Sequence, residues 1–198
     1  MEQRGQTEDL RARVRRRTRE EVAQVAFDLF AERGFEVTTA NEVAEAAGIS
    51  RASFFRLFSS KEEAVFVALE VTGAAIAAAL AARPSREDPW TALRAAFIGA
   101  TDQYLDEPEQ ALARARLIQQ NPSLRARLID LQNSWGREIR EPVAERMGEP
   151  ADSLAVEAVV RAALAAFDVA ATRWGESGGG DLIAEIDGSF EAVAAVFE

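Results

Sequence analysis

The stretch that decides the fold is TTANEVAEAAGISRASFFRLF, residues 38–58. It contains two short segments with the hydrophobic spacing of helices, and Gly48 lies between them. Thr39 is followed three residues later by Glu42, which predicts a capping box at the start of the first segment. Ser50 stands where it can cap the second segment. The pattern therefore predicts two short helices joined by a tight turn.

The second of these helices, residues 51–57, has two chemically different faces. Phe54, Leu57 and Phe58 share one face and are predicted to pack on the preceding helix. The opposite face carries arginines with small and aromatic residues between them, namely Arg51, Ala52, Ser53, Phe55 and Arg56. A helix that enters the major groove of DNA is built in this way. A helical hairpin with no nucleic-acid partner would have the same geometry.

The remainder of the chain also has helical periodicity, and the class that it predicts is all-α. Capping boxes are expected at Thr18–Glu21 and at Ser60–Glu63, and Pro89, Pro108 and Pro122 stand where first-turn prolines would. No strand pattern is present. The pattern predicts about nine helices, over residues 18–34, 39–48, 51–57, 60–82, 89–105, 109–119, 122–146, 152–175 and 181–197.

Three parts of the chain follow from this pattern. Residues 1–14 lack a hydrophobic period and are expected to be a flexible basic arm. Residues 15–60 are predicted to form a three-helix domain that contains the helix-turn-helix. Residues 61–198 are predicted to form a second helical domain, and residues 61–82 are expected to be one long helix that connects the two.

The residues that the sequence lacks restrict its chemistry. The chain has neither cysteine nor histidine, and its only lysine is Lys61. Disulfides, thiolate or histidine catalysis and zinc sites with such ligands are therefore excluded. An enzyme built on carboxylates and hydroxyls remains an alternative, but no motif indicates one. We expect no enzymatic activity, no metal and no cofactor.

The charge is unevenly distributed. The chain has a net charge of −10, which by itself disfavours a nucleic-acid partner. Residues 1–63 carry 11 basic and 12 acidic residues, whereas residues 64–198 carry 12 and 21. Six arginines crowd into one short stretch, namely Arg11, Arg13, Arg15, Arg16, Arg17 and Arg19. The acidity therefore belongs to the second domain, and the arginine run is either a DNA contact or a solvated tail.

Neither a secretory signal nor a convincing membrane span is found. The N-terminus is polar and charged. Residues 64–82 are apolar, but alanine supplies most of this apolarity and Glu70 lies within the segment. We expect a helix of a soluble protein here, no membrane partner and a cytoplasmic location.

A specific resemblance accompanies these patterns. Residues 18–69 resemble the N-terminal domain of the tetracycline-repressor (TetR) family of transcriptional regulators. The matching motifs are LFAERGF at 29–35, TT at 38–39, VAEAAGIS at 43–50 and SKEE at 60–63, together with Phe54 and Phe58. The resemblance implies a dimeric, ligand-responsive regulator that binds a palindromic operator in double-stranded DNA. In most of this family the regulator is a repressor that the effector releases.

The resemblance also implies roles for individual residues. Thr39 and Ser50 would contact phosphates at helix N-termini. Three neighbours, Arg51, Ala52 and Ser53, would approach bases, while Arg56 and Lys61 would hold the DNA backbone. The family commonly has tyrosine where this chain has Phe55, so a hydroxyl bond to phosphate is lost at that position.

The second domain carries weaker signals for a ligand. Its aromatic residues are spaced as in helices and fit either a core or an apolar pocket with a few polar groups. The candidate ligand-binding residues are Trp90, Phe97, Tyr104, Arg116, Trp135 and Phe167. The segment 114–174 and the sequence Phe54-Phe55-Arg56 are similar to the TetR branch related to the mycofactocin regulator. That similarity implies a small apolar effector or a fatty acyl-CoA.

Apolar stripes on the last two helices predict a homodimer interface. One stripe carries Val159, Phe167, Ala170 and Trp174, and the other carries Ile183, Ile186, Phe190, Val193 and Phe197. Family members pair through these helices, although a core within one chain could also absorb both stripes. The alternative function is a helical protein-interaction module that does not bind specific DNA sequences.

Overall fold

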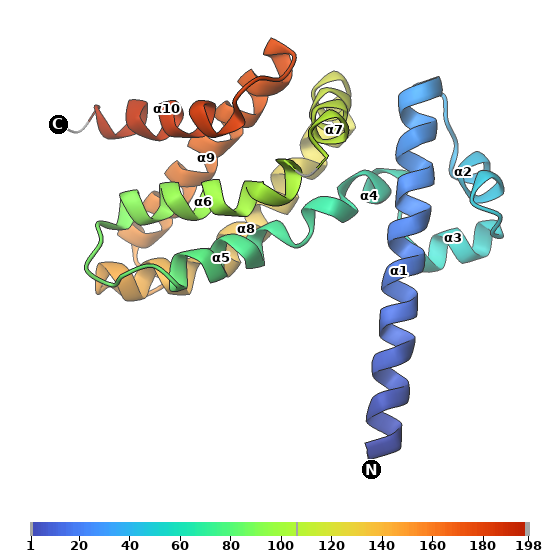
Figure 1. The fold of residues 1–198 in the computed structure, drawn as a ribbon, viewed down its shortest axis with the longest axis horizontal. Coiled ribbons are helices and arrows are strands. Elements are labelled where there is room, and N and C mark those ends of the chain that lie inside the picture. The colour runs from blue at the N-terminus through green and yellow to red at the C-terminus, as the bar shows by residue number, and fades with distance from the viewer. Residues whose placement is uncertain (1, 106, 197–198) are drawn as a thin grey trace. The chain divides into compact units, whose positions relative to one another are not determined.

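The computed structural model describes residues 2–105 and 107–196, and for residues 2–9 and 102–105 it describes the backbone alone. The described residues form ten α-helices and one 3-10 turn, without any strand (Figure 1). The predicted all-α class is confirmed. Two compact units make up the chain, Met1–Leu69 and Glu70–Glu198. Their boundary falls later than the boundary expected between residues 60 and 61.

The first unit packs three short helices against one long helix. Its elements are α1 (Glu2–Arg33), α2 (Ala40–Ala46), α3 (Arg51–Leu57), α4 (Lys61–Phe66) and the 3-10 turn η1 (Val67–Leu69). Aromatic rings supply much of the core, because Phe30 packs edge-on against Phe35 at 5.0 Å and Phe54 lies 5.0 Å from Phe58. Both α2 and α3 therefore have an anchored inner face.

The predicted caps of the helix-turn-helix are confirmed. The hydroxyl of Thr39 accepts a bond from the Glu42 amide at 3.3 Å, and the Glu42 carboxylate accepts one from the Thr39 amide at 2.7 Å. Ser50 accepts a bond from the amide of Ser53 at 3.1 Å, which caps α3. Gly48 has a φ of +65°, a left-handed conformation that glycine adopts without strain. These local bonds fix the two helices and the turn between them.

The two other predicted capping boxes are wrong. Thr18 lies inside α1, and its hydroxyl donates to the carbonyl of Val14 at 3.0 Å instead of capping a helix. Ser60 makes no side-chain cap bond. The carboxylate of Glu63 instead accepts from the amide and the hydroxyl of Ser59, at 2.7 and 2.6 Å. At Thr18 the helix continues through the predicted cap, and at Ser60 the preceding residue supplies the bonds to Glu63.

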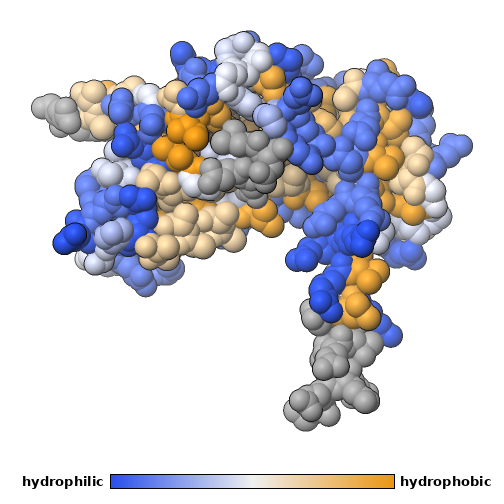
Figure 2. All heavy atoms as spheres, in the orientation of Figure 1, coloured by the Kyte–Doolittle hydropathy of each residue, from blue (hydrophilic) through white to orange (hydrophobic). Residues whose placement is uncertain are grey.

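The structure places residues 2–14 in α1, where the sequence predicts an arm without regular structure. Ion pairs at helical spacing support the helix further along, with Arg17 and Glu21 2.9 Å apart and Arg16 and Glu20 3.8 Å apart. Hydrophilic and hydrophobic residues lie side by side on the exposed part of this helix (Figure 2). Exposed ion pairs of this kind contribute little to stability.

The long connecting helix predicted over residues 61–82 is divided in the structure, which accounts for the tenth helix. The turn η1 follows α4, and α5 (Thr72–Ala81) begins after Val71. The reason is tertiary, because α4 packs on α1 in the first unit and α5 packs on α6 and α8 in the second. By length and composition alone Lys61–Ala81 could cross a membrane, which is weak evidence. The division of this segment does not favour a span.

The second unit is a bundle of six helices. They are α5, α6 (Pro89–Leu105), α7 (Pro108–Gln120), α8 (Pro122–Met147), α9 (Leu154–Ser177) and α10 (Leu182–Ala194). The three predicted first-turn prolines begin α6, α7 and α8, as expected. The helix α8 continues through Pro142. The close crossing of α5 and α8 depends on Gly73, since a Cβ there would lie 2.7 Å from Cδ1 of Trp135.

Candidate DNA interface and effector site

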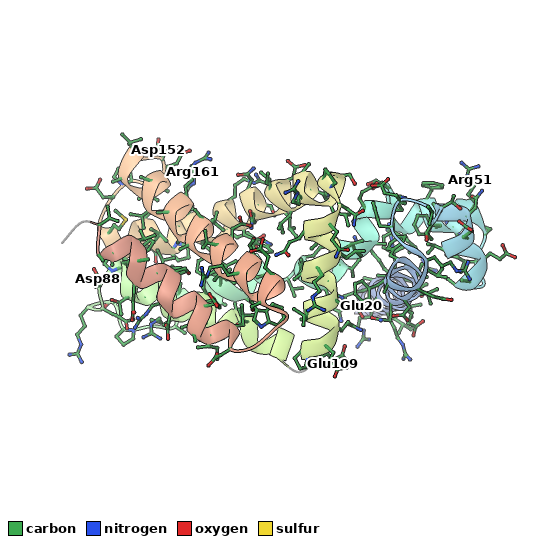
Figure 3. The ribbon with its side chains drawn as sticks, turned by 90° about the horizontal axis from the view of Figure 1, so that it is seen from above. Glu20, Arg51, Asp88, Glu109, Asp152 and Arg161 are labelled. Carbon is green, nitrogen blue, oxygen red and sulfur yellow. The ribbon has the colours of Figure 1, made fainter. Side chains whose placement is uncertain are left out.

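The outer face of α3 is exposed and chemically distinct. Phe54 and Phe58 are buried, which turns Arg51, Phe55 and Arg56 outward. The side chain of Arg51 points away from the body of its unit (Figure 3), and its guanidinium lies 5.6 Å from the centre of the Phe55 ring. Phe55 is 44% exposed and lies edge-on to Phe54, with the ring centres 5.5 Å apart. This face therefore offers cationic donors around an exposed apolar ring.

Several polar residues predicted to contact DNA already form hydrogen bonds within the protein. Arg56 donates to the hydroxyl of Ser53 at 2.8 Å, and Thr39 donates its hydroxyl proton to Glu42 at 2.8 Å. Ser50 shares a hydrogen bond with Ser53 at 3.0 Å. The structure thus brings six of the predicted residues, Ser50 to Ser53, Phe55 and Arg56, onto one short helix and its cap. The exposed Ala52 leaves room for close approach.

Two arginines of the run bind the C-terminal end of α3. Arg15 donates to the carbonyl of Arg56 at 3.2 Å, and Arg19 donates to the carbonyl of Leu57 at 3.2 Å. Arg19 also forms an ion pair with Glu63 at 2.7 Å. Cations at the C-terminal end of a helix satisfy its last carbonyls and favour its dipole. These two arginines hold the recognition helix, a role that the sequence pattern did not predict.

Lys61 also acts inside the unit. Its ammonium donates to the carbonyls of Phe35, Glu36 and Thr38, at 2.6, 3.3 and 3.0 Å, and lies 4.3 Å from the centre of the Phe35 ring. An ammonium has three donors, and all three are used here. Lys61 therefore holds the loop before α2 through these bonds. The phosphate contact implied by the resemblance would compete with these bonds.

Two carboxylates of this unit are stabilised in their charged form. The backbone amide and then the hydroxyl of Thr39 lower the pKa of Glu42. For Glu63, burial is the largest single effect and would raise the pKa, but bonds from Ser59 and Arg19 together outweigh it and lower the pKa. Both residues are therefore ionised at neutral pH and keep the helix termini capped.

In the second unit an aromatic cluster joins four helices, α6, α8, α9 and α10. Phe97 lies 5.2 Å from Phe167 and 5.6 Å from Phe190, and Trp135 lies 6.3 Å from Phe167. Trp90 stacks on Phe190 at 4.9 Å and donates its indole proton to the Phe190 carbonyl at 3.1 Å. Four of the predicted ligand-binding residues thus meet in one cluster, and Phe190 was missed because its stripe indicated a dimer interface.

Two predicted ligand-binding residues are not part of this cluster. The side chain of Tyr104 lies outside the described residues. Arg116 is exposed on α7 and lies against the end of α9, 3.5 Å from the carbonyl of Gly175. It packs so closely on the glycine loop that a Cβ at Gly178 would lie 3.0 Å from its guanidinium. The structure therefore assigns Arg116 to the junction of α7 and α9.

Trp135 has an unsatisfied polar atom in the core. The side chain is 2% exposed, and its indole nitrogen has no hydrogen-bond partner among the described residues. A buried N–H without an acceptor costs about 1–3 kcal/mol. An acceptor atom of a bound molecule would remove this cost, which makes the indole N–H a candidate ligand contact.

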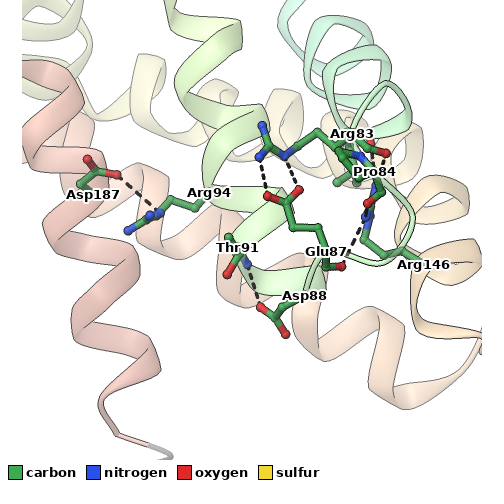
Figure 4. A network of polar contacts seen from close by, with 9 residues as sticks. Arg83, Pro84, Glu87, Asp88, Thr91, Arg94, Arg146 and Asp187 are labelled. Carbon is green, nitrogen blue, oxygen red and sulfur yellow. Dashed lines mark hydrogen bonds and ion pairs between the residues drawn. The ribbon is translucent and has the colours of Figure 1, made fainter.

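Arg146 fastens the end of α5. It donates to the carbonyls of Leu80, Arg83, Pro84 and Glu87, at distances from 2.6 to 3.4 Å. Figure 4 shows this network beside the ion pair of Arg83 and Glu87. The hydrogen bond with Arg83 is the main cause that lowers the pKa of Glu87. A single side chain of α8 thus fixes the loop from α5 to α6.

The predicted dimer stripes are largely absorbed by the core of the unit. Phe167, Ala170 and Trp174 are buried, as are Ile186 and Phe190, and Phe197 lies outside the described residues. Val193 of the predicted stripe instead lines an apolar surface that remains between α9 and α10, a groove of about 410 Å³. It is lined by Ala165, Ala166, Val169, Ser189, Ala192, Val193 and Val196.

The comparisons with known proteins define the class. Residues 23–68 match the family described as bacterial regulatory proteins, tetR family, and residues 87–198 match the MftR C-terminal domain. The chain therefore belongs to the TetR family of transcriptional regulators, with a C-terminal domain of the MftR type, and both parts of the resemblance are confirmed. The members of this family are bacterial regulatory proteins.

Particular relatives agree with this assignment. The chain is 34% identical over 149 residues to the HTH-type transcriptional regulator TcmR of Streptomyces glaucescens, covering 72% of this chain and 66% of TcmR. It is 32% identical over 136 residues to the putative mycofactocin biosynthesis transcriptional regulator MftR of Mycobacterium tuberculosis, covering 69% of each chain. The chain thus aligns with about two thirds of the length of these relatives.

Among solved structures, the chain resembles Thermus thermophilus FadR, a TetR family transcriptional repressor in complex with lauroyl-CoA. The TM-score is 0.54 at 25% identity, and the match covers 87% of this chain and 91% of FadR. A TetR-family regulator of Streptomyces coelicolor has the same fold, with a TM-score of 0.53 at 20% identity over 92% of this chain and 83% of the regulator.

Proposed function

We propose that this protein is a cytoplasmic transcriptional repressor that binds a palindromic operator as a dimer through α3. The observation that carries the proposal is the outer face of α3, where Arg51 and Phe55 are exposed while Phe54 and Phe58 anchor the helix. A face of this kind places donors at base edges when its helix enters the major groove. The excess of acidic over basic residues belongs to residues 64–198 and therefore lies outside α3.

The test is fluorescence anisotropy with DNA that flanks the encoding gene. Footprinting first identifies the palindrome that the protein protects. Arg51→Ala should then weaken binding to that palindrome by about 10- to 100-fold and change binding to unrelated DNA much less. Arg86→Ala is the matched control, because it removes an exposed arginine from the other unit. If folded protein protects no palindrome at moderate salt, the interaction-module alternative replaces the repressor.

The N-terminal stretch is tested separately. Since Arg15 and Arg19 bind α3 carbonyls, deletion of residues 1–14 spares them and removes only the preceding segment. If that segment contacts phosphates, the deletion reduces the slope of log affinity against log salt concentration. An unchanged slope removes the segment from the DNA interface.

The effector that we propose is an apolar or amphipathic small molecule of the acyl-CoA class. Support comes from the aromatic cluster around Phe97 and Phe167, from the unsatisfied indole nitrogen of Trp135 and from the lauroyl-CoA bound by FadR. Lauroyl-CoA added to the operator complex should weaken operator affinity by about 5- to 150-fold, the usual range of allosteric coupling. Free coenzyme A and lauric acid are the controls, and native mass spectrometry of the purified protein identifies any co-purified ligand.

The dimer interface that we propose is the groove between α9 and α10, which exposes Val169 and Val196. Val169→Glu should convert the dimer to a monomer in size-exclusion chromatography with light scattering, because a charge cannot be buried there without a partner. Leu154→Glu, also an exposed apolar position on α9, is the matched control. A dimer that survives Val169→Glu would place the interface elsewhere.

A further inference from the structure

A second groove on this unit lies between α8 and α9 and has a volume of about 400 Å³. Its apolar floor consists of Gly136, Val160 and Leu164. The helices approach closely at this floor, since a Cβ on Gly136 would lie 3.2 Å from Cδ1 of Leu164. An adjoining hollow of about 240 Å³ shares Leu164 and Arg161 with it, so the groove continues along α9.

Three arginines line this groove. Arg137 and Arg140 come from α8, and Arg161 comes from α9, where it points outward (Figure 3). Glu157 is the one acidic residue of the 400 Å³ groove, and it is held by Arg161 at 2.9 Å. The lining of the 400 Å³ groove therefore has an excess of two positive charges, while the adjoining hollow contains Asp168. This excess stands in a part of the chain, residues 64–198, where acidic residues outnumber basic ones by 21 to 12.

Two of these arginines have no protein partner in the part of the chain that the structure describes, and one of them, Arg140, has a nitrogen that is shielded from solvent. Among the described residues, neither Arg137 nor Arg140 forms a hydrogen bond or an ion pair, and the Nε of Arg140 is shielded from solvent without an acceptor. A shielded cationic donor without an acceptor is unfavourable, and like charges that converge add to the cost. An anion with several oxygen atoms in the groove would remove both costs.

We propose that this groove binds the phosphate or pyrophosphate group of a small amphipathic ligand. The planar fork of arginine matches the oxygen atoms of a phosphate, and two or three guanidiniums bind one phosphate readily. A phosphate monoester carries a charge of about −1.5 to −2 at neutral pH, which matches the excess of the groove, whereas one carboxylate would neutralise only half of it. The floor of Val160 and Leu164 suits the carbon skeleton next to the phosphate.

The groove and part of the aromatic cluster are formed by neighbouring residues on the same two helices, α8 and α9. Gly136 follows Trp135 on α8, and Leu164 precedes Phe167 by one helical turn on α9. A phosphate held in the groove therefore lies on the outer side of the helix pair that carries the cluster. The inference rests on the proposed function, in that the phosphate belongs to the effector that controls the repressor.

The test uses the full-length protein with inorganic pyrophosphate as the probe. Isothermal titration at constant ionic strength compares the wild type with Arg137→Gln/Arg140→Gln. The matched control is Arg125→Gln/Arg127→Gln, which removes the same charge from exposed arginines of the same helix. We expect the wild type and the control to bind alike, and the groove variant to bind at least about tenfold more weakly because charge-assisted bonds are lost.

Further variants keep the result interpretable. If circular dichroism shows that the glutamine variant is unfolded, Arg137→Lys/Arg140→Lys retains the charge, loses the fork and should bind with intermediate affinity. Equal binding by all variants, or no binding by the wild type, overturns the proposal. A groove variant that loses its dimeric state, with no pyrophosphate bound by the wild type, would assign the groove to a second copy of the chain and overturn it as well.

Operator binding separates the two proposals. Without ligand, the groove variant should bind the operator as the wild type does. If the wild type binds no operator, the proposed function fails, while the titration with pyrophosphate still decides the groove. If coenzyme A binds but inorganic pyrophosphate does not compete with it, the phosphate site lies elsewhere and the groove proposal fails.

Discussion

Replacing Lys61 by methionine decides between two roles for the only lysine of the chain. The change retains most of the side-chain stem and removes the ammonium that donates to Phe35, Glu36 and Thr38. The structure predicts that the variant loses stability in the first unit. The resemblance alone implies instead that it loses a contact to the DNA backbone.

The magnitude follows from the bonds. A hydrogen bond to a charged group contributes about 1.5–3 kcal/mol. The two shorter bonds of Lys61, at 2.6 and 3.0 Å, are part-buried, whereas the third is longer and exposed. Because the side chain is partly solvated, we expect a total loss of about 3 kcal/mol, toward the lower end of the sum. In a unit of this size that loss lowers the urea midpoint by about 2–3 M.

The positions of the tryptophans allow the two units to be read separately. Trp90, Trp135 and Trp174 all belong to Glu70–Glu198, so their fluorescence reports the second unit, while circular dichroism reports both. Lys61→Met should lower the urea midpoint of the first unit, which only circular dichroism detects. The fluorescence transition of the second unit should not change. Arg51→Met, which removes an exposed cation from α3, should leave both transitions in place and weaken operator binding.

Reductive methylation provides an independent measurement. As the only lysine, Lys61 can be followed by mass spectrometry without interference from other lysines, and it should react far more slowly in the folded protein than in urea. The reasoning is refuted if Lys61→Met costs less than about 1 kcal/mol and still weakens binding to every DNA sequence alike. That result would make Lys61 a phosphate contact.

Three further predictions concern single interactions. Arg146→Met should lower the unfolding free energy of the second unit by about 3 kcal/mol, measured by tryptophan fluorescence in urea, because four carbonyls lose their donor. The control Arg173→Met breaks an exposed ion pair and should lower it by less than about 1 kcal/mol. Equal losses in the two variants would contradict the role of Arg146. Gly73→Ala should destabilise the same unit by about 2 kcal/mol or more, because the added Cβ would lie 2.7 and 2.9 Å from atoms of Trp135, and an unchanged midpoint would contradict this. The lowered pKa of Glu63 predicts a stabilisation that is complete above its ordinary pKa of 4.5 and is lost as the pH falls through the lower folded value. Glu63→Gln should therefore flatten the acid limb of the stability curve of the first unit, and an acid limb as steep as that of the wild type would refute this.

Local signals in the sequence determined the helix-turn-helix. The caps at Thr39 and Ser50 and the left-handed Gly48 involve atoms only a few residues apart, so their pattern is readable before folding. The same holds for the spacing of Phe54 and Phe58, which turns the opposite face of α3 outward. The family assignment rests on these same local features.

Predictions failed where the local pattern fits more than one arrangement and the rest of the fold selects between them. Thr18 and Ser60 have the pattern of caps, but α1 extends through Thr18 and the carboxylate of Glu63 is taken by Ser59 and Arg19. Residues 61–82 have the composition of one helix, yet their two ends pack in different units. Helix propensity is a weak preference that packing overrides.

The sequence by itself determined the class of the protein, most of its helices and the face of α3 that points outward. Only the tertiary structure decided which side chains share a surface. It brought Phe97, Trp135 and Phe167 from three helices into one cluster, and it placed Arg140 beside Arg161 in a groove. The physical reason is that capping and periodicity act within one helical turn, whereas burial and charge excess depend on elements that meet only after folding.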